Sequence, residues 1–72
     1  MSIQEKISLL EEMLELENGT LTPNMELSSI EEYDSMAKLS LIVLMDDEFD
    51  KKLTGEQIHE FNTVKDILNF MS

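Results

Sequence analysis

The amino-acid sequence predicts an all-α fold, a small four-helix bundle with a long first loop and a short third helix. Three observations lead to this prediction. Apolar residues recur at helical spacing in several segments, residue types that cap helices stand before those segments, and no segment alternates apolar and polar residues as a half-buried strand does. The 72 residues suffice for one small domain, which we assign to residues 1–72.

The first predicted helix runs from about Ser2 to Glu17. Ser2 and Glu5 fit a capping box, in which each side chain accepts the backbone N–H of the other residue. One helical face carries four apolar residues, Ile3, Ile7, Leu10 and Leu14. The acidic residues off this stripe are Glu11, Glu12 and Glu15. Asn18-Gly19 is the predicted stop, because both residue types tolerate the left-handed conformation that ends many helices.

Residues 20–33 form a long connection, in which Pro23 and its polar neighbours oppose continuous helix. We expect a structured loop whose apolar residues pack onto the helices, namely Leu21, Met25, Leu27 and Ile30. The second helix is predicted from Ser35 to about Phe49, with Asp34 as its cap. Its residues 39–45 are apolar on almost every side, which predicts packing on both flanks or an internal apolar space.

The last two predicted helices each begin with a capping box. Thr-Gly-Glu-Gln at residues 54–57 opens the short third helix, which carries Ile58 and Phe61. Thr63 and Asp66 open the fourth helix, whose apolar face consists of Val64, Ile67, Leu68 and Met71. We expect three methionines in the core, Met13, Met45 and Met71.

Charge dominates the composition, since 16 Asp and Glu residues stand against 5 Lys for a net charge of −11. We therefore expect no nucleic-acid and no membrane binding, and attraction toward partners with basic surfaces. The lack of Cys and the single His exclude disulfides and multi-ligand zinc sites of the Cys or His type. With no signal-peptide pattern and no apolar run longer than residues 41–45, we expect a cytoplasmic protein.

The candidate site is Asp34-Ser35-Met36, at the start of the second predicted helix. A serine in the first helical turn presents its hydroxyl at the loop junction, where free backbone N–H groups and the helix dipole favour negative charge. A phosphodiester on Ser35 would be stabilised there, whereas Asp34 is better explained as a cap and recognition element. An Asp-Ser pair at a helix start, taken alone, is usually only a cap.

This motif, followed by an apolar helix that ends in Asp-Asp-Glu-Phe at residues 46–49, resembles the acyl carrier protein family. That family has an Asp-Ser-Leu motif at the start of its second helix, and Met36 replaces the leucine here. Residues 53–56 and 61–67 are similar to the family's third segment and the entry to its last helix. The resemblance implies that a phosphopantetheinyl transferase attaches 4′-phosphopantetheine from coenzyme A to Ser35.

The resemblance implies a carrier rather than an enzyme, which holds an acyl or aminoacyl group as a thioester on a flexible arm. The implied partners are acyl-activating ligases or synthases with basic surfaces, visited by a monomer. Candidate contacts with these partners are Met36, Lys38, Asp46, Asp47 and Glu48. Four candidates to line a space for the acyl chain, with plain core packing as the open alternative, are Leu39, Ile42, Val43 and Phe61.

The surface beside the motif differs from that of housekeeping carriers of fatty acid synthesis. Ala37, Lys38 and Ser40 stand where acidic residues are typical, and Glu32-Tyr33 stands where a small turn with glycine is common. A bulky aromatic residue before Asp-Ser resembles carriers of specialised pathways. We therefore expect a polyketide, peptide or polysaccharide-modifying system rather than fatty acid synthesis.

Other chemistry is less well supported by the residues. A calcium loop starting at Asp46 would have Lys51 where glycine is expected and Gln57 where glutamate is expected. His59 has no predicted catalytic partner and is interpreted as a structural residue. The open alternative function is an unmodified acidic adaptor that binds a basic protein, in which Ser35 is a helix cap or a kinase target.

Overall fold

The computed structural model describes residues 2–71, which form four α-helices and one 3-10 turn. The elements are α1 (Ile3–Met13), η1 (Leu27–Ser29), α2 (Ser35–Phe49), α3 (Gly55–Glu60) and α4 (Val64–Phe70). The only β pairing among these residues is an isolated antiparallel bridge between Glu26 and Thr63. The predicted all-α, four-helix fold with a long first loop and a short third helix is confirmed.

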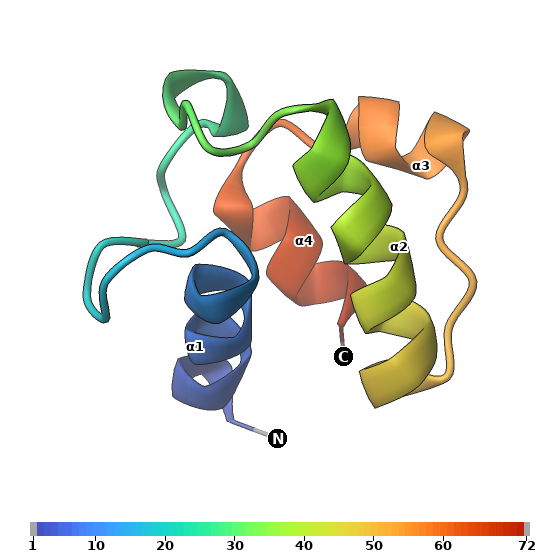
Figure 1. Cartoon of the computed structure of the whole chain (residues 1–72), viewed down its shortest axis with the longest axis horizontal. Coiled ribbons are helices and arrows are strands. Elements are labelled where there is room, and N and C mark those ends of the chain that lie inside the picture. The colour runs from blue at the N-terminus through green and yellow to red at the C-terminus, as the bar shows by residue number, and fades with distance from the viewer. Residues whose placement is uncertain (1, 72) are drawn as a thin grey trace.

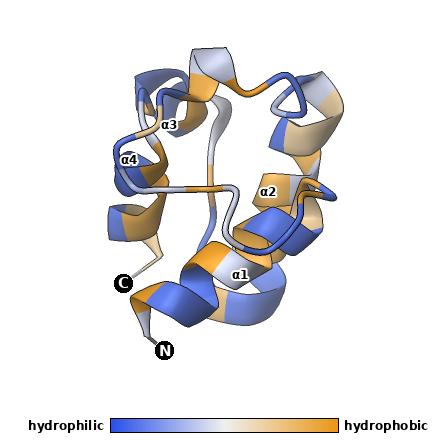
Figure 2. Ribbon diagram, turned by 90° about the vertical axis from the view of Figure 1, so that its left-hand side faces the viewer, coloured by the Kyte–Doolittle hydropathy of each residue, from blue (hydrophilic) through white to orange (hydrophobic). Residues whose placement is uncertain are grey.

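Helix α1 packs against α2 and α4, and α3 lies across one end of the bundle (Figure 1). The start of α2, the 3-10 turn η1 and α3 lie at the same end of the domain, as Figures 1 and 2 both show. Residues that are distant in the sequence therefore meet around the first turn of α2.

The core is formed by the predicted apolar faces of the helices, and hydrophobic residues recur along α1, α2 and α4 in Figure 2. Each helix contributes at least one buried residue, such as Leu10, Leu41, Ile58 and Ile67. Met45 and Met71 are buried as expected, whereas Met13 is half-buried against the core.

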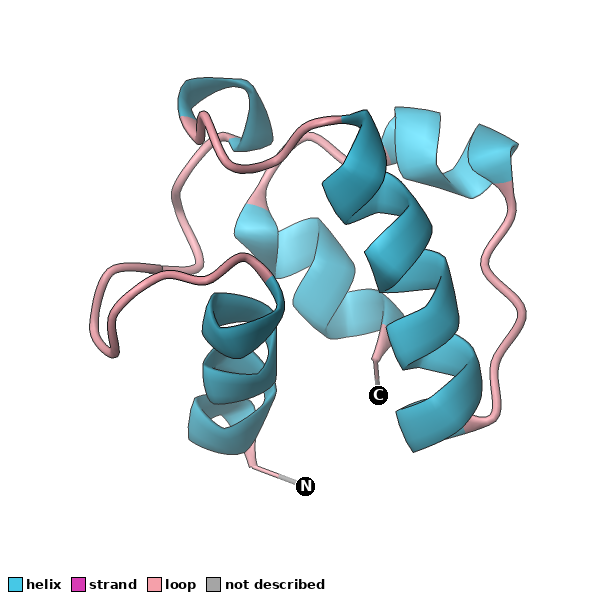
Figure 3. Cartoon of the chain, viewed as in Figure 1, coloured by secondary structure: helices cyan, strands magenta, loops and turns pink. Residues whose placement is uncertain are grey.

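The connection at residues 20–33, drawn as loop on either side of η1 in Figure 3, packs onto the helices as predicted. Leu21, Leu27 and Ile30 are buried. Backbone bonds tie this segment to the start of α4, because Val64 N–H donates to the Met25 carbonyl at 3.0 Å and Leu27 N–H to the Asn62 carbonyl at 2.9 Å. Buried apolar side chains and backbone hydrogen bonds therefore both hold the connection against the helices.

The predicted end of the first helix is wrong, because α1 ends at Met13 rather than near residue 17. Glu15 adopts the left-handed conformation with φ 60°. Its N–H donates to the Glu12 carbonyl at 3.1 Å, and Leu16 N–H donates to the Glu11 carbonyl at 2.8 Å. These two bonds form a Schellman ending, which satisfies the last carbonyls of the helix before Asn18-Gly19 is reached.

The burial of two residues of α1 differs from what the predicted apolar stripe implied. Ile3 is 61% exposed, so the buried stripe begins at Ile7. Glu11 is 2% exposed, and its Oε2 accepts the N–H of Gly19 at 2.8 Å and of Leu21 at 3.0 Å. The carboxylate is tolerated inside because it pairs with two backbone donors that have left the helix.

Helix α2 has the predicted bounds, and Asp34 Oδ1 caps it by accepting the Ala37 N–H at 2.9 Å. The capping boxes at Ser2–Glu5, Thr54–Gln57 and Thr63–Asp66 are also confirmed. Helix α2 ends at Phe49, and Asp50 caps it in the left-handed conformation with φ 51°. Within residues 2–71, no helix is both long and apolar enough to cross a membrane.

Candidate functional site

Ser35 is the first residue of α2 and is exposed to solvent. Within residues 2–71, its side-chain oxygen has no hydrogen-bond partner. The Asp34 carboxylate caps the helix by accepting the Ala37 N–H and forms no hydrogen bond with the Ser35 hydroxyl. The structure thus leaves Ser35 Oγ accessible for modification.

The first turn of α2 also fits a negatively charged substituent on Ser35. Asp34 satisfies two of the N–H groups there, that of Ala37 through Oδ1 and that of Lys38 through its carbonyl at 3.0 Å. The N–H groups of Ser35 and Met36 have no acceptor in the described part of the chain. These donors and the dipole of a 15-residue helix stabilise an anion at this end.

An exposed row of apolar side chains follows Ser35 along α2. Met36, Leu39 and Val43 are 72%, 61% and 58% exposed, and we call them the apolar ridge. At 3.6 residues per turn, Ser35, Leu39 and Val43 share the face opposite buried Leu41. The expectation that Leu39 and Val43 line an internal acyl space is therefore wrong in this structure, because both side chains point to solvent.

The other two acyl-space candidates are half-buried and lie in different places. Ile42 lines a shallow groove of about 290 Å³ together with Val43, Lys52 and Leu53, so two of the four candidates share this groove. Phe61 packs edge-on against Phe70, with ring centroids 5.9 Å apart. The structure does not bring the four candidates together, so core packing, the open alternative, describes Ile42 and Phe61 better.

The acidic end of α2 is exposed to solvent. Asp46, Asp47 and Glu48 lie in the last turns of the helix, roughly 16–20 Å along its axis from Ser35 at 1.5 Å per residue. They are helical rather than part of a loop, which is inconsistent with a calcium loop that starts at Asp46. Among the described residues, no group of three or more acidic or histidine side chains is arranged to hold a metal ion.

A second feature beside Ser35 is a groove of about 240 Å³, which we call the Tyr33 groove. It is lined by the 27–33 connection, the first turn of α2 and α3, which meet at one end of the domain (Figure 1). Its polar lining residues are Ser28, Tyr33, Lys38 and His59.

Tyr33 and Lys38 contact each other in this groove. Lys38 Nζ lies 5.7 Å from the centroid of the Tyr33 ring, within the range of a cation–π interaction. The Tyr33 hydroxyl is buried without a hydrogen-bond partner in residues 2–71, and burial raises the pKa of Tyr33. The sequence offered no catalytic partner for His59, which was interpreted as structural. Its place in the groove with Tyr33 depends on how α3 packs and has no local sequence signal.

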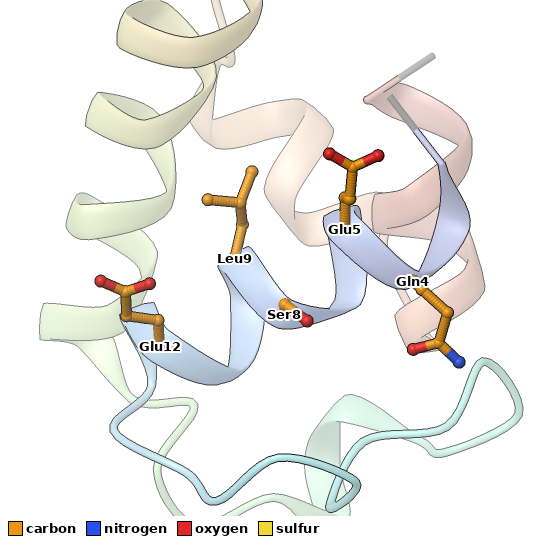
Figure 4. A pocket seen from close by; sticks show the side chains of 5 residues that line it. All are labelled: Gln4, Glu5, Ser8, Leu9 and Glu12. Carbon is orange, nitrogen blue, oxygen red and sulfur yellow. The ribbon is translucent and has the colours of Figure 1, made fainter.

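Another surface depression lies away from this site. It measures about 330 Å³, and its lining residues all come from α1, as Figure 4 shows for Gln4, Glu5, Ser8, Leu9 and Glu12. A depression along one helix, with no residue from a second element, offers a ligand little enclosure. It does not include Ser35 or its neighbours.

Comparison with known proteins identifies one family. Residues 7–71 match the family described as the phosphopantetheine attachment site, and this range includes the whole of α2. No curated protein and no solved structure matches the chain.

Proposed function

The chain belongs to the phosphopantetheine attachment site family, and from this premise we propose that Ser35 is the residue that bears 4′-phosphopantetheine. Domains of this family carry the group and do not themselves catalyse the reactions of the cargo. The observation that supports Ser35 is its position, an exposed hydroxyl without a hydrogen bond at the first residue of α2. The family match favours this function over the unmodified acidic adaptor.

The residues around Ser35 have separate roles in this proposal. When bound, phosphopantetheine supplies a thiol on a long tether, which holds acyl groups as thioesters. Asp34 keeps the first turn of α2 formed, and the N–H groups of Ser35 and Met36 stabilise the phosphodiester charge. Because the helix end is already ordered by its cap, attachment requires no rearrangement of the backbone.

We further propose that the cargo is an acyl or aminoacyl group of a dedicated pathway. The apolar ridge and Lys38 support this proposal. A carrier that docks onto the basic surfaces of housekeeping enzymes is expected to have acidic residues at these positions instead. A partner that fits α2 has an apolar groove beside its active-site entrance. It has basic residues roughly 16–20 Å away, opposite Asp46, Asp47 and Glu48.

The partners in this proposal are a phosphopantetheinyl transferase, which installs the arm, and a ligase or synthase, which loads or uses the cargo. The carrier acts as a monomer, because a stable dimer through the apolar ridge would block the face that bears Ser35. Tethering increases the effective concentration of cargo at each partner, so brief contacts suffice.

The experiment is transfer of the arm from coenzyme A by a broad-specificity phosphopantetheinyl transferase, followed by intact-mass measurement. The proposal predicts a gain of one phosphopantetheine group for the wild type and none for Ser35→Ala. The matched control is Ser40→Ala, an exposed serine one turn further along α2, which should gain the group. An unmodified wild type, or a modified Ser35→Ala, contradicts the assignment.

A further inference from the structure

The charge of the Tyr33 groove differs from that of the chain as a whole. The net charge is −11, yet within residues 2–71 no Asp or Glu lines this groove. Every polar residue of its lining can donate a hydrogen bond, and these residues are Ser28, Tyr33, Lys38 and His59. By contrast, the depression on α1 includes Glu5 and Glu12. The groove therefore suits a negatively charged acceptor, which the acidic parts of the surface repel.

Lys38 has a charge that the protein itself does not neutralise. Within residues 2–71, it forms no ion pair with a carboxylate, although 16 acidic residues are present in the chain. Its Nζ lies over the Tyr33 ring instead, and a cation–π contact leaves the positive charge in place. Lys38 is half-buried, so a carboxylate that reached it would be screened less by salt than on an open surface.

The Tyr33 hydroxyl is the second unsatisfied group of this groove. It is buried and has no acceptor within residues 2–71. A buried hydroxyl without a partner costs about 1–3 kcal/mol, so native proteins rarely leave one unpaired. A ligand that brings an acceptor into the groove supplies what both Tyr33 and Lys38 lack.

The charges along α2 change sign from its start to its end. Lys38 lies in the first turns, whereas Asp46 and Glu48 follow it by 8 and 10 residues, about 12–15 Å along the axis at 1.5 Å per residue. The apolar ridge lies between these two ends. A partner that docks on α2 thus meets a positive group near Ser35 and negative groups at the far end, and this order specifies one orientation of the partner.

The following inference rests on Ser35 as the proposed attachment residue and concerns the partner that acts on the carried group. We propose that the Tyr33 groove is a docking site for an Asp or Glu side chain of that partner, with the carboxylate paired to Lys38. Apolar residues next to this acid contact the apolar lining of the groove, which consists of Leu27, Ile30, Ile58 and Phe61. At about 240 Å³ the groove accommodates one side chain rather than a folded element.

A single acidic side chain is compatible with the net charge of the carrier. At physiological ionic strength the Debye length is about 8 Å, so carboxylates farther away repel the docked acid only weakly. The partner's remaining surface stays basic, opposite Asp46, Asp47 and Glu48. The groove also excludes unsuitable partners, because an enzyme built for a carrier with an acid at the position of Lys38 places a basic residue there and meets a like charge.

The test titrates two tripeptides with blocked ends, Leu-Glu-Leu and Leu-Lys-Leu, into the protein without an arm. The amide NMR signals of Ser28 and His59 report on the groove, and the affinity is fitted from these signals alone. At about 0.15 M ionic strength, the glutamate peptide should shift both signals and bind at least about threefold more tightly than the lysine peptide. Net charge alone predicts the opposite order, because a charge of −11 attracts the lysine peptide.

Lys38→Gln should weaken binding of the glutamate peptide about threefold, and Lys38→Glu should reverse the order of the two peptides. The matched control is Lys65→Gln, which makes the same charge change at an exposed residue of α4 and should behave as the wild type. The proposal is overturned if the glutamate peptide shifts neither signal, if the wild type does not prefer it, or if Lys38→Gln and Lys65→Gln change its affinity equally. Since the titration needs no arm, a wrong assignment of Ser35 would appear only in the mass measurement, and the two failures are distinguishable.

Discussion

Glu11→Gln tests whether a buried carboxylate fixes the first connection. The Glu11 side chain is 2% exposed, and its Oε2 accepts the N–H of Gly19 and of Leu21. Hydrogen bonds to charged groups contribute about 1.5–3 kcal/mol, and bonds between neutral groups about 0.5–1.5 kcal/mol. Glutamine keeps an acceptor oxygen but loses the charge, so both bonds weaken.

The expected loss is about 2 kcal/mol, because the lower cost of burying an amide offsets part of the weaker bonding. Glu11→Ala should cost more, about 2–6 kcal/mol, since it leaves two N–H donors without an acceptor. A domain of 72 residues has a total stability of about 4–11 kcal/mol, so either change is a large fraction of it.

The assay is urea denaturation followed by far-UV circular dichroism, with the free energy of unfolding extrapolated to water. Glu12→Gln is the control, because Glu12 is an exposed neighbour on the same helix and should change stability by less than about 0.5 kcal/mol. If Glu11→Gln and Glu12→Gln destabilise the protein equally, the proposed role of the buried carboxylate is refuted.

Three further changes test separate parts of the structure. Glu15→Gly should raise the free energy of unfolding by about 0.5–1 kcal/mol in the same denaturation assay, because glycine adopts φ 60° without strain. Glu12→Gly is the control within α1, where glycine should lower the free energy of unfolding by about the same amount. Hydrogen bonds from the N–H groups of Asn62 and Thr63 lower the pKa of Asp66, so the charged carboxylate stabilises the fold fully above its ordinary pKa of 3.8 and loses this effect as the pH falls below that value. The difference in unfolding free energy between wild type and Asp66→Asn should therefore shrink as the pH falls below 3.8. A difference that stays constant would contradict this reasoning. Leu39→Ser should lower kcat/KM for arm transfer roughly tenfold if docking buries the apolar ridge, and the equally exposed Ile3→Ser on α1 should leave it unchanged.

Helix starts were predictable from the sequence because capping is local. Ser2 with Glu5, and Asp34 before Ser35, satisfy N–H groups within the same four residues, so their pattern is visible without knowledge of the fold. The end of α1 was not predictable, because it depends on a glutamate in a conformation that glycine or asparagine usually adopts.

The burial of Glu11 was also hidden, since its partners are 8 and 10 residues away and meet it only after the connection folds back. On α2, the apolar residues on nearly every side gave no direction for the core, and only packing against α1 shows that Leu39 and Val43 face outward. The Tyr33 groove required three separate segments to meet, which no local pattern indicates.

The proposed attachment motif, by contrast, could be predicted from the sequence once the capped start, the apolar helix and its acidic end were considered together. Asp34, Ser35 and the apolar helix behind them are contiguous, and a family match over residues 7–71 agrees with them. The sequence does not specify the cargo, because a carrier contributes the tether and its partners select the acyl group.

Peptide mapping by mass spectrometry tests the central claim most directly, because it locates the added group on a single residue. After arm transfer, the account predicts phosphopantetheine on Ser35 alone, with Ser28, Ser29 and Ser40 unmodified. The group on any of those three serines, or its absence from Ser35 in a fully modified protein, would contradict the account.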